Sequence, residues 1–382
     1  MRTKTLARPA LAASMLLSAA WVGTAAAPTL AAGGATPRTA TSRAAACDEA
    51  CLKSFIDRYL AALVAHDPSR LPVAGSVRFT ENGVRLPLGD ALWRTFSGLA
   101  GYRHDFYDPE SGDVASYVAI RENGLPDFLA LRLKIAGRRI TEIETVVDRS
   151  APRALTMPPV EPIWNEVEPA ATRLTREQLV QGALGYLRAV VFEDGRLAPF
   201  AESCIRLENG GVMALGPHDK PPVPMPPLPA TIADSDQWIA AVQSTMGMGC
   251  SRQLNTGVYA FIDSYDNPRF PLVDVQRQIV FGVFNFRRRG TVKDVKMPNG
   301  RTYQMMPSTQ WPNEVLNTEA WKFKDGKITR IEAVFKGDQD YKTGTGWPGG
   351  RKGESRPNLD EPQSPVTDAR TAPVARRSRA VP

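Results

Sequence analysis

Phe55-Ile-Asp-Arg-Tyr-Leu-Ala-Ala-Leu-Val-Ala-His-Asp67, followed by Val77-Arg-Phe-Thr-Glu-Asn-Gly83, is the stretch that decides the fold. Apolar residues recur in the first segment at three- and four-residue spacing, which predicts an amphipathic helix. Asp67-Pro68 ends that helix, because the residue before a proline disfavours helical geometry. The second segment alternates as a half-buried strand does, and Asn82-Gly83 turns the chain at its end.

This helix-and-strand unit occurs twice. Aligned without gaps at an offset of 127, Tyr59–Gly83 and Tyr186–Gly210 are identical at eleven positions, including the closing Glu-Asn-Gly. The last strand recurs as well, because residues 140–147 resemble residues 328–335 at an offset of 188. The second copy therefore holds 61 additional residues between these anchors. Two copies of so long a unit predict a tandem domain duplication rather than a solenoid.

Strand-like runs separated by turn signals fill the rest of the first copy, at 102–107, 114–121, 128–135 and 140–147. One long helix and a meander of antiparallel strands predict an α+β domain whose helix covers one face of a curved sheet. The predicted organisation is a signal peptide at 1–32, a disordered lead-in at 33–46, a first domain at 47–150, a linker at 151–171, a second domain with inserted loops at 172–338, and a disordered tail at 339–382.

The N-terminal residues predict export. Basic Arg2, Lys4 and Arg8 precede an apolar run at 11–22, and small-residue sites follow it, as in a secretory signal peptide. We therefore expect a secreted or periplasmic protein with no membrane contact after the signal is removed. No other apolar stretch is long enough to span a bilayer.

The charge distribution argues against a nucleic-acid partner. Of the formal net charge of +7, the first 46 residues carry +5 and residues 351–382 carry +3, which leaves −1 for residues 47–350. A nucleic-acid-binding domain shows its basic surface on the folded part. The one basic run there, Arg287-Arg288-Arg289, is expected to be a solvated strand end.

The four cysteines allow three pairings, and an oxidising compartment favours disulfides. Their positions favour Cys47 with Cys51 and Cys204 with Cys250, one bridge in each domain. A metal site is the weaker interpretation, because neither pair has the two-residue spacing of a zinc site and the three histidines are scattered. No metal site is predicted.

A helix carrying Arg58-Tyr59-Leu60, then Asp67, then a strand ending in an acid resembles the NTF2-like, or SnoaL-like, superfamily, which includes ketosteroid isomerase, polyketide cyclases and scytalone dehydratase. Both 47–150 and 172–338 are similar to it. The resemblance implies two cone-shaped domains, each a curved antiparallel sheet wrapped on helices with an apolar pocket at its open end. It implies chemistry without a cofactor. It indicates the fold better than the activity, since the superfamily also contains non-catalytic binding domains.

The resemblance also implies site residues. It places an oxyanion-binding tyrosine on the helix and a general base at the strand end, namely Tyr59 and Glu81 in the first copy and Tyr186 and Glu208 in the second. A second oxyanion acid falls near Leu129 in the first copy and at Glu319 in the second. Only the second copy therefore holds the whole set. The structural alternative is that each tyrosine is a core residue and that Glu-Asn-Gly is ordinary turn chemistry.

Six further residues are candidates for ligand binding: Trp93, His104, Trp238, Tyr259, Asp263 and Arg277. Each has a structural alternative. The aromatic residues suit a packed core as well as a cavity lining. His104 is expected at the surface, on the opposite face of its strand from Asp105. Asp263 and Arg277 suit either a buried ion pair or a clamp for an anionic ligand.

Three functional hypotheses follow. The first is an exported, cofactor-independent lyase or isomerase that removes a proton from a small carbonyl compound, carbohydrate- or polyketide-like. The second is a secreted binding protein whose tandem pockets hold a small ligand without turnover. The third is an interaction scaffold with filled pockets. The expected partner is a small molecule, and an oligomer through the sheet faces is possible.

Overall fold

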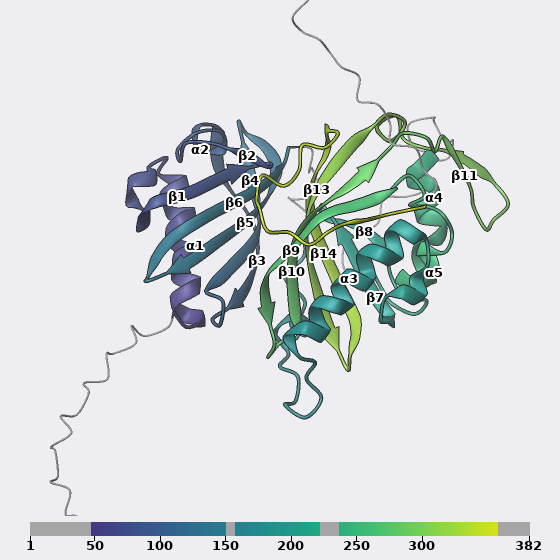
Figure 1. The fold of residues 1–382 in the computed structure, drawn as a ribbon, viewed down its shortest axis with the longest axis horizontal. Coiled ribbons are helices and arrows are strands. Elements are labelled where there is room, and N and C mark those ends of the chain that lie inside the picture. The colour runs from purple at the N-terminus through teal and green to yellow at the C-terminus, as the bar shows by residue number, and fades with distance from the viewer. Residues whose placement is uncertain (1–46, 150–156, 222–236, 358–382) are drawn as a thin grey trace, which may run out of the picture. The chain divides into compact units, whose positions relative to one another are not determined.

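The computed structural model describes residues 47–149, 157–221 and 237–357. The predicted signal peptide and lead-in lie outside these ranges. The architecture is α+β, as the sequence indicated, with two large sheets and few helices (Figure 1). The cone shape of each domain and the domain boundaries stay predictions.

The first sheet has six strands in the order β2-β1-β6-β5-β4-β3. Their bounds are β1 Val73–Glu81, β2 Val84–Arg85, β3 Phe96–Asp108, β4 Asp113–Glu122, β5 Leu125–Ala136 and β6 Arg139–Asp148. The helices of this half are α1 Glu49–Val64 and the short α2 Leu92–Thr95. Figure 1 shows α1 lying against this sheet.

The second sheet has seven strands in the order β15-β9-β10-β13-β14-β7-β8. Their bounds are β7 Phe200–Glu208, β8 Gly211–Ala214, β9 Ser264–Asp274, β10 Ile279–Arg288, β13 Asn313–Lys324, β14 Lys327–Asp340 and β15 Glu354–Ser355. The helices of this half are α3 Arg176–Phe192, α4 Gln237–Thr245 and α5 Cys250–Leu254. A separate hairpin, β11 Asp294–Lys296 and β12 Thr302–Gln304, fills part of the predicted insertion.

The two sheets share one connectivity. Reading β7, β8, β9, β10, β13 and β14 as the counterparts of β1 to β6 gives the same strand order in both. Each sheet has a single parallel pair, β1 with β6 and β7 with β14, and its other neighbours are antiparallel. Positions can therefore be compared between the halves through their strand register.

Local sequence explains where the long helices begin. Asp48 caps α1, its carboxylate accepting the Cys51 amide at 2.9 Å. Thr175 and Gln178 form a capping box at the start of α3. After each helix an aspartate, Asp67 or Asp194, accepts the amide two residues further on and starts a short 3₁₀ turn. This turn directs the chain into the first strand of each sheet.

A core cluster joins residues of the two sheets. Phe106 and Tyr117 of the first sheet pack against Phe281 of the second, with ring centroids 5.9 and 5.7 Å apart. Trp164, in the predicted linker, is buried in the same cluster. Trp164 therefore anchors the described part of the linker to the contact between the two sheets. Whether the protein forms an oligomer through its sheets stays a prediction.

The tail prediction was wrong for residues 339–357. β14 continues to Asp340, and β15 pairs with β9. Between them Trp347 is 9% exposed and donates its indole N–H to Thr80 Oγ1 at 2.8 Å. The segment has no apolar periodicity because only isolated residues hold it in place, such as Trp347 at Thr80 and the short strand β15 at β9. The remaining tail residues lie outside the described ranges.

Both predicted disulfides are confirmed, Cys47–Cys51 and Cys204–Cys250. None of the described helices has the length and apolar character needed to cross a membrane. In the same part of the chain, no group of three or more His, Cys, Asp or Glu side chains is arranged to hold a metal ion.

Candidate functional site

A cavity of about 370 Å³ lies in the second half, between α3 and the strands of the second sheet. Such a volume suits a small ligand. The lining combines apolar and aromatic walls with a few buried polar groups. Its polar and aromatic residues include Tyr186, Arg206, Glu208, Trp238, Tyr259, Phe261, Arg288 and Glu319.

Tyr186 and Glu319 form a direct hydrogen bond in this cavity. The Tyr186 hydroxyl donates to Glu319 Oε1 at 3.0 Å, and the two side chains come from α3 and from the middle of β13. Tyr186 is 1% exposed and Glu319 is 2% exposed. The second carboxylate oxygen of Glu319, Oε2, is buried without a hydrogen-bond partner among the described residues. An acid so placed has one oxygen oriented by the tyrosine and the other left for a ligand.

Glu208 ends β7 at the same cavity, and the residue after it fixes the strand end. Asn209 has a φ of 44° and exchanges two hydrogen bonds with the backbone of Phe335, at 2.9 and 3.2 Å. Asn82 has a φ of 49° and forms the same pair of bonds with Val147, at 2.8 and 3.2 Å. The repeated Glu-Asn-Gly therefore has a structural asparagine, and the glutamate before it is aimed by that anchor.

Arg206, which sequence reasoning missed, is the counter-ion of Glu208. Its Nε lies 3.2 Å from Glu208 Oε1, and its Nη2 donates to Gln253 Oε1 at 2.7 Å. The guanidinium also lies 4.6 Å from the ring centroid of Tyr259. A signal was present, since residues two apart on a strand share a face. Arg206 and Glu208 are such a pair on β7.

Burial raises the pKa of both Glu208 and Glu319, and the positive charge of Arg206 opposes the rise in each. Burial raises the pKa of Glu208 above its ordinary range, while Arg206 and Arg288 oppose that shift. Burial, with the nearby charge of Glu208, raises the pKa of Glu319 to about 8 against the opposing effects of Arg206 and Tyr186. Burial therefore favours the protonated form of Glu319, while Glu208 has a cation beside it that favours its ionised form.

In the first half, the corresponding residues serve the structure. Tyr59 is 1% exposed and packs edge-on against Trp93 at 5.2 Å between ring centroids. Glu81 accepts the Leu92 amide at 3.1 Å and pairs with Arg149 at 2.6 Å, so it anchors the start of α2. Trp93 is accordingly a core residue at 2% exposure.

Strand register corrects one predicted equivalence. Glu319 pairs with Ala333 and Leu131 pairs with Thr145, at matching positions of the two sheets. The first-half counterpart of Glu319 is therefore Leu131, two residues beyond the predicted Leu129. Both leucines are fully buried, so the conclusion that the first half lacks the second acid is unchanged.

The other ligand-binding candidates divide into two groups. Trp238 and Tyr259 line the cavity, and their role in ligand binding stays a prediction. His104 was expected at the surface, but it is 4% exposed and its Nδ1 lies 2.7 Å from Glu332 Oε2, across the contact between the sheets. Its position facing a carboxylate of the other sheet explains the burial, which the local sequence could not reveal.

Asp263 and Arg277 do not pair with each other and lie outside the cavity lining. Asp263 accepts the backbone amide of Arg289. Arg277 pairs with Asp274 at 2.9 Å and with Glu49 at 2.8 Å. The expected ion pair between them does not form, and each instead has structural partners of its own.

The expectation that Arg287 to Arg289 is a solvated strand end was wrong. Arg287 pairs with the fully buried Glu314 at 2.6 Å. Arg288 lines the cavity at 7% exposure, and Arg289 is 6% exposed. β10 lies between β9 and β13, and acids of these two strands, Asp266 and Glu314, pair with Arg287.

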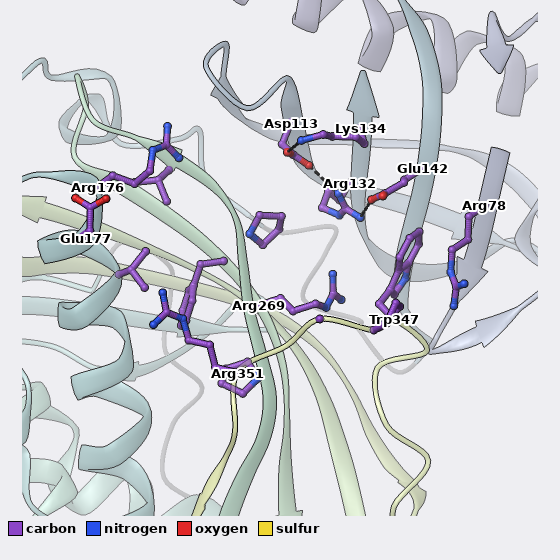
Figure 2. Close-up of a pocket in the computed structure, with 17 residues that line it drawn as sticks. Arg78, Asp113, Arg132, Lys134, Glu142, Arg176, Glu177, Arg269, Trp347 and Arg351 are labelled. Carbon is purple, nitrogen blue, oxygen red and sulfur yellow. Dashed lines mark hydrogen bonds and ion pairs between the residues drawn. The ribbon is translucent and has the colours of Figure 1, made fainter. Parts of the chain in front are cut away.

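A second hollow, of about 640 Å³, is more strongly charged (Figure 2). Three of its arginines lie beside Trp347: the guanidinium groups of Arg78, Arg132 and Arg269 are 4.6, 5.2 and 5.8 Å from the ring centroid. Figure 2 shows that Asp113 and Glu142 contact Arg132, at 2.7 and 2.5 Å. Arg132, Lys134, Arg176 and Arg269 are paired with acids, so much of the hollow is a structural ion-pair network, although Arg78 and Arg351 have no ion pair among the described residues. The cavity at Tyr186 is the stronger candidate site.

Comparison with known proteins gives a family of undetermined function. Residues 172–335 match a family model described as a domain of unknown function (DUF8021). No curated protein sequence matches the chain. The match covers the half that contains the cavity.

Similar solved structures include AusH from Aspergillus nidulans, at 10% identity over 42% of this chain and 86% of that one. Others are a Bacillus subtilis protein provisionally named an isomerase, at 10% identity over 42% and 87%, and a Shewanella denitrificans OS-217 protein provisionally named a SnoaL-like polyketide cyclase, at 12% identity over 42% and 92%. The TM-score is 0.23 in each case, which carries no conclusion about activity.

Proposed function

We propose that the second half is a cofactor-independent lyase or isomerase that removes a proton beside the carbonyl group of a small molecule. The observation that supports it is the convergence of a hydrogen-bonded Tyr186–Glu319 pair and an Arg206–Glu208 pair on one cavity. One carboxyl there favours the protonated form and the other has a cation beside it. Such a division assigns an acid and a base.

In the proposed reaction Glu208 takes the proton from the carbon next to the carbonyl, and the C–H electron pair passes into an enolate. Glu319, protonated on Oε2, donates to the enolate oxygen, while the Tyr186 hydroxyl holds Glu319 Oε1. Donors aimed at a developing oxyanion in a dry site stabilise the transition state. Return of the proton to another carbon gives an isomerase, and loss of a leaving group from the neighbouring carbon gives a lyase.

The test follows proton exchange, because it requires no known substrate. The protein is incubated in D₂O with a panel of small enolisable ketones and keto esters, and deuterium entry beside the carbonyl is measured by NMR. We expect the wild type to accelerate exchange for some members, and Glu208→Gln to lower the rate at least about 100-fold, which is typical of losing a general base. Glu202→Gln changes an exposed glutamate of the same strand and should leave the rate unchanged.

The alternative is a binding protein without turnover, which the apolar and aromatic share of the lining favours. It predicts that panel members bind while the wild type exchanges none of them, or that Glu208→Gln exchanges as fast as the wild type. Either result would reject the enzyme proposal.

We infer two further points about the whole chain. The shared strand order and the two asparagine anchors support a tandem duplication with an NTF2-like fold in each half. The two disulfides support export, since such bonds persist in oxidising compartments.

A further inference from the structure

Arg288 is a buried cation that the proposed proton transfer does not use. It is the last residue of β10, lines the cavity and is 7% exposed. Phe261 forms one wall beside it, with the guanidinium 5.2 Å from the ring centroid. Desolvation of a cation is costly unless the charge is paired, and burial lowers the pKa of Arg288 to about 10.

Among the described residues, the polar side chains that contact Arg288 both do so at its Nη1. Its Nη1 lies 3.4 Å from Asn313 Oδ1 and 3.2 Å from Asp338 Oδ1, and the Asp338 side chain is 50% exposed. Its Nε is buried with no hydrogen-bond partner in the described part of the chain. A guanidinium carries five N–H donors in a planar fork, so two contacts at Nη1 leave other donors of Arg288 for a ligand.

The fully paired Arg132 shows what a buried arginine of this protein can have: it contacts three carboxylates, at 2.7, 2.5 and 2.9 Å. Arg206, in the cavity with Arg288, shares an Nε without a hydrogen-bond partner among the described residues, but it also has the Gln253 amide oxygen, the buried Glu208 and the face of Tyr259. A buried polar group without partners requires an explanation, and an absent ligand is one.

The first half has the opposite charge at this position. In the second sheet, Arg288 of β10 lies opposite Asn313 of β13. At the matching position of the first sheet, Glu122 of β4 lies opposite Leu125 of β5, so Glu122 is the counterpart of Arg288. The Glu122 carboxylate is satisfied by Arg149 at 2.6 Å. The cation of the second half is therefore not required by the strand pairing that the two sheets share.

We propose that the cavity binds an anionic ligand whose carboxylate pairs with the Arg288 guanidinium. A planar fork matches a carboxylate in a bidentate arrangement, and the surrounding aromatic wall suits an apolar body on that ligand. Combined with the proposed function, on which this part rests, the substrate class is an oxo acid: a carbonyl compound that Glu208 deprotonates while Arg288 holds its carboxylate.

The test compares two probes of equal shape, benzoate and benzamide, by isothermal titration calorimetry at low ionic strength. Wild-type protein should bind benzoate at least about tenfold more tightly, since the charge-assisted pair is available only to the anion. Neither probe can be enolised, so the result is independent of whether Glu208 catalyses anything. Equal affinities, including the case in which neither probe binds, would overturn the proposal.

Variants then assign the effect to Arg288. Arg288→Gln should bring the affinity ratio close to one by weakening benzoate alone, and Arg252→Gln, at an exposed arginine of the same half, should keep the wild-type ratio. If circular dichroism shows that Arg288→Gln does not fold, Arg288→Lys replaces the fork by a point charge and should lower the ratio at least about threefold. A ratio that survives in the folded variant would contradict the assignment.

Discussion

Glu319→Gln should change how the stability of the protein depends on pH. The substitution keeps the size of the side chain and its acceptor for the Tyr186 hydroxyl, and removes only the ability to ionise. Burial raises the pKa of Glu319 to about 8, from an ordinary value of 4.5. Between these values the folded protein holds a proton that the unfolded chain has released, so the free energy of unfolding of the wild type falls as pH rises.

The size of the effect follows from the two pKa values. They differ by about 3.5 pH units, which at about 1.4 kcal/mol per unit amounts to on the order of 5 kcal/mol between pH 4.5 and pH 8. Below pH 4.5 Glu319 is protonated in both states, and above pH 8 it is ionised in both, so the dependence is confined to this window. Glu208 has a raised pKa of its own and leaves a slope of the same sign in the variant.

Urea unfolding at several pH values between 5 and 9, followed by tryptophan fluorescence, measures the effect. The variant should be close to the wild type at pH 5 and more stable than it at pH 8. Glu202→Gln, at an exposed position, should retain the wild-type slope. If the stability difference between Glu319→Gln and wild type is the same at pH 5 and pH 8, Glu319 does not carry the proton and its proposed donor role is wrong.

Two further predictions concern the scaffold. Trp347→Ala should lower the free energy of unfolding by about 3–5 kcal/mol, because it empties a buried site and removes the indole donor to Thr80. Urea unfolding measures this loss. A midpoint equal to that of the wild type would mean that the C-terminal segment does not stabilise the fold. Replacing Cys204 and Cys250 by serine opens a loop of 46 residues and should cost about 4 kcal/mol, against about 2 kcal/mol for the four-residue Cys47–Cys51 loop. Equal losses on comparing the two variants by thermal unfolding would contradict the loop-length argument.

The parts of the structure that sequence predicted are those governed by local rules. The helices around Tyr59 and Tyr186 follow from apolar spacing and clear stop signals, and the strands follow from alternation and turns. The repeated Glu-Asn-Gly was visible because each asparagine must adopt a left-handed conformation and hold the neighbouring strand, which few residues do well. The Tyr186–Glu319 contact was reached through family resemblance, since nothing local joins residues 133 apart.

The misplaced residues are those whose environment comes from distant chain. His104 is buried only because Glu332 of the other sheet faces it, and Trp347 only because Thr80 and Arg78 lie beneath its loop. Arg288 was taken for a solvated residue because three consecutive arginines usually mark a surface. Neither spacing nor composition reports which strands will flank a segment.

Strand register also shows how the two halves differ at the positions of the candidate site. By strand register, Phe79, Leu131 and Glu122 of the first half occupy the positions of Arg206, Glu319 and Arg288 in the second. Phe79 and Leu131 fill the first core with apolar volume, and Glu122 is paired with Arg149. The second half instead buries charge around an open cavity, at a cost in stability that packing does not require. Glu319 Oε2 and Arg288 Nε are buried and have no hydrogen-bond partner among the described residues. A ligand in the cavity would supply those partners.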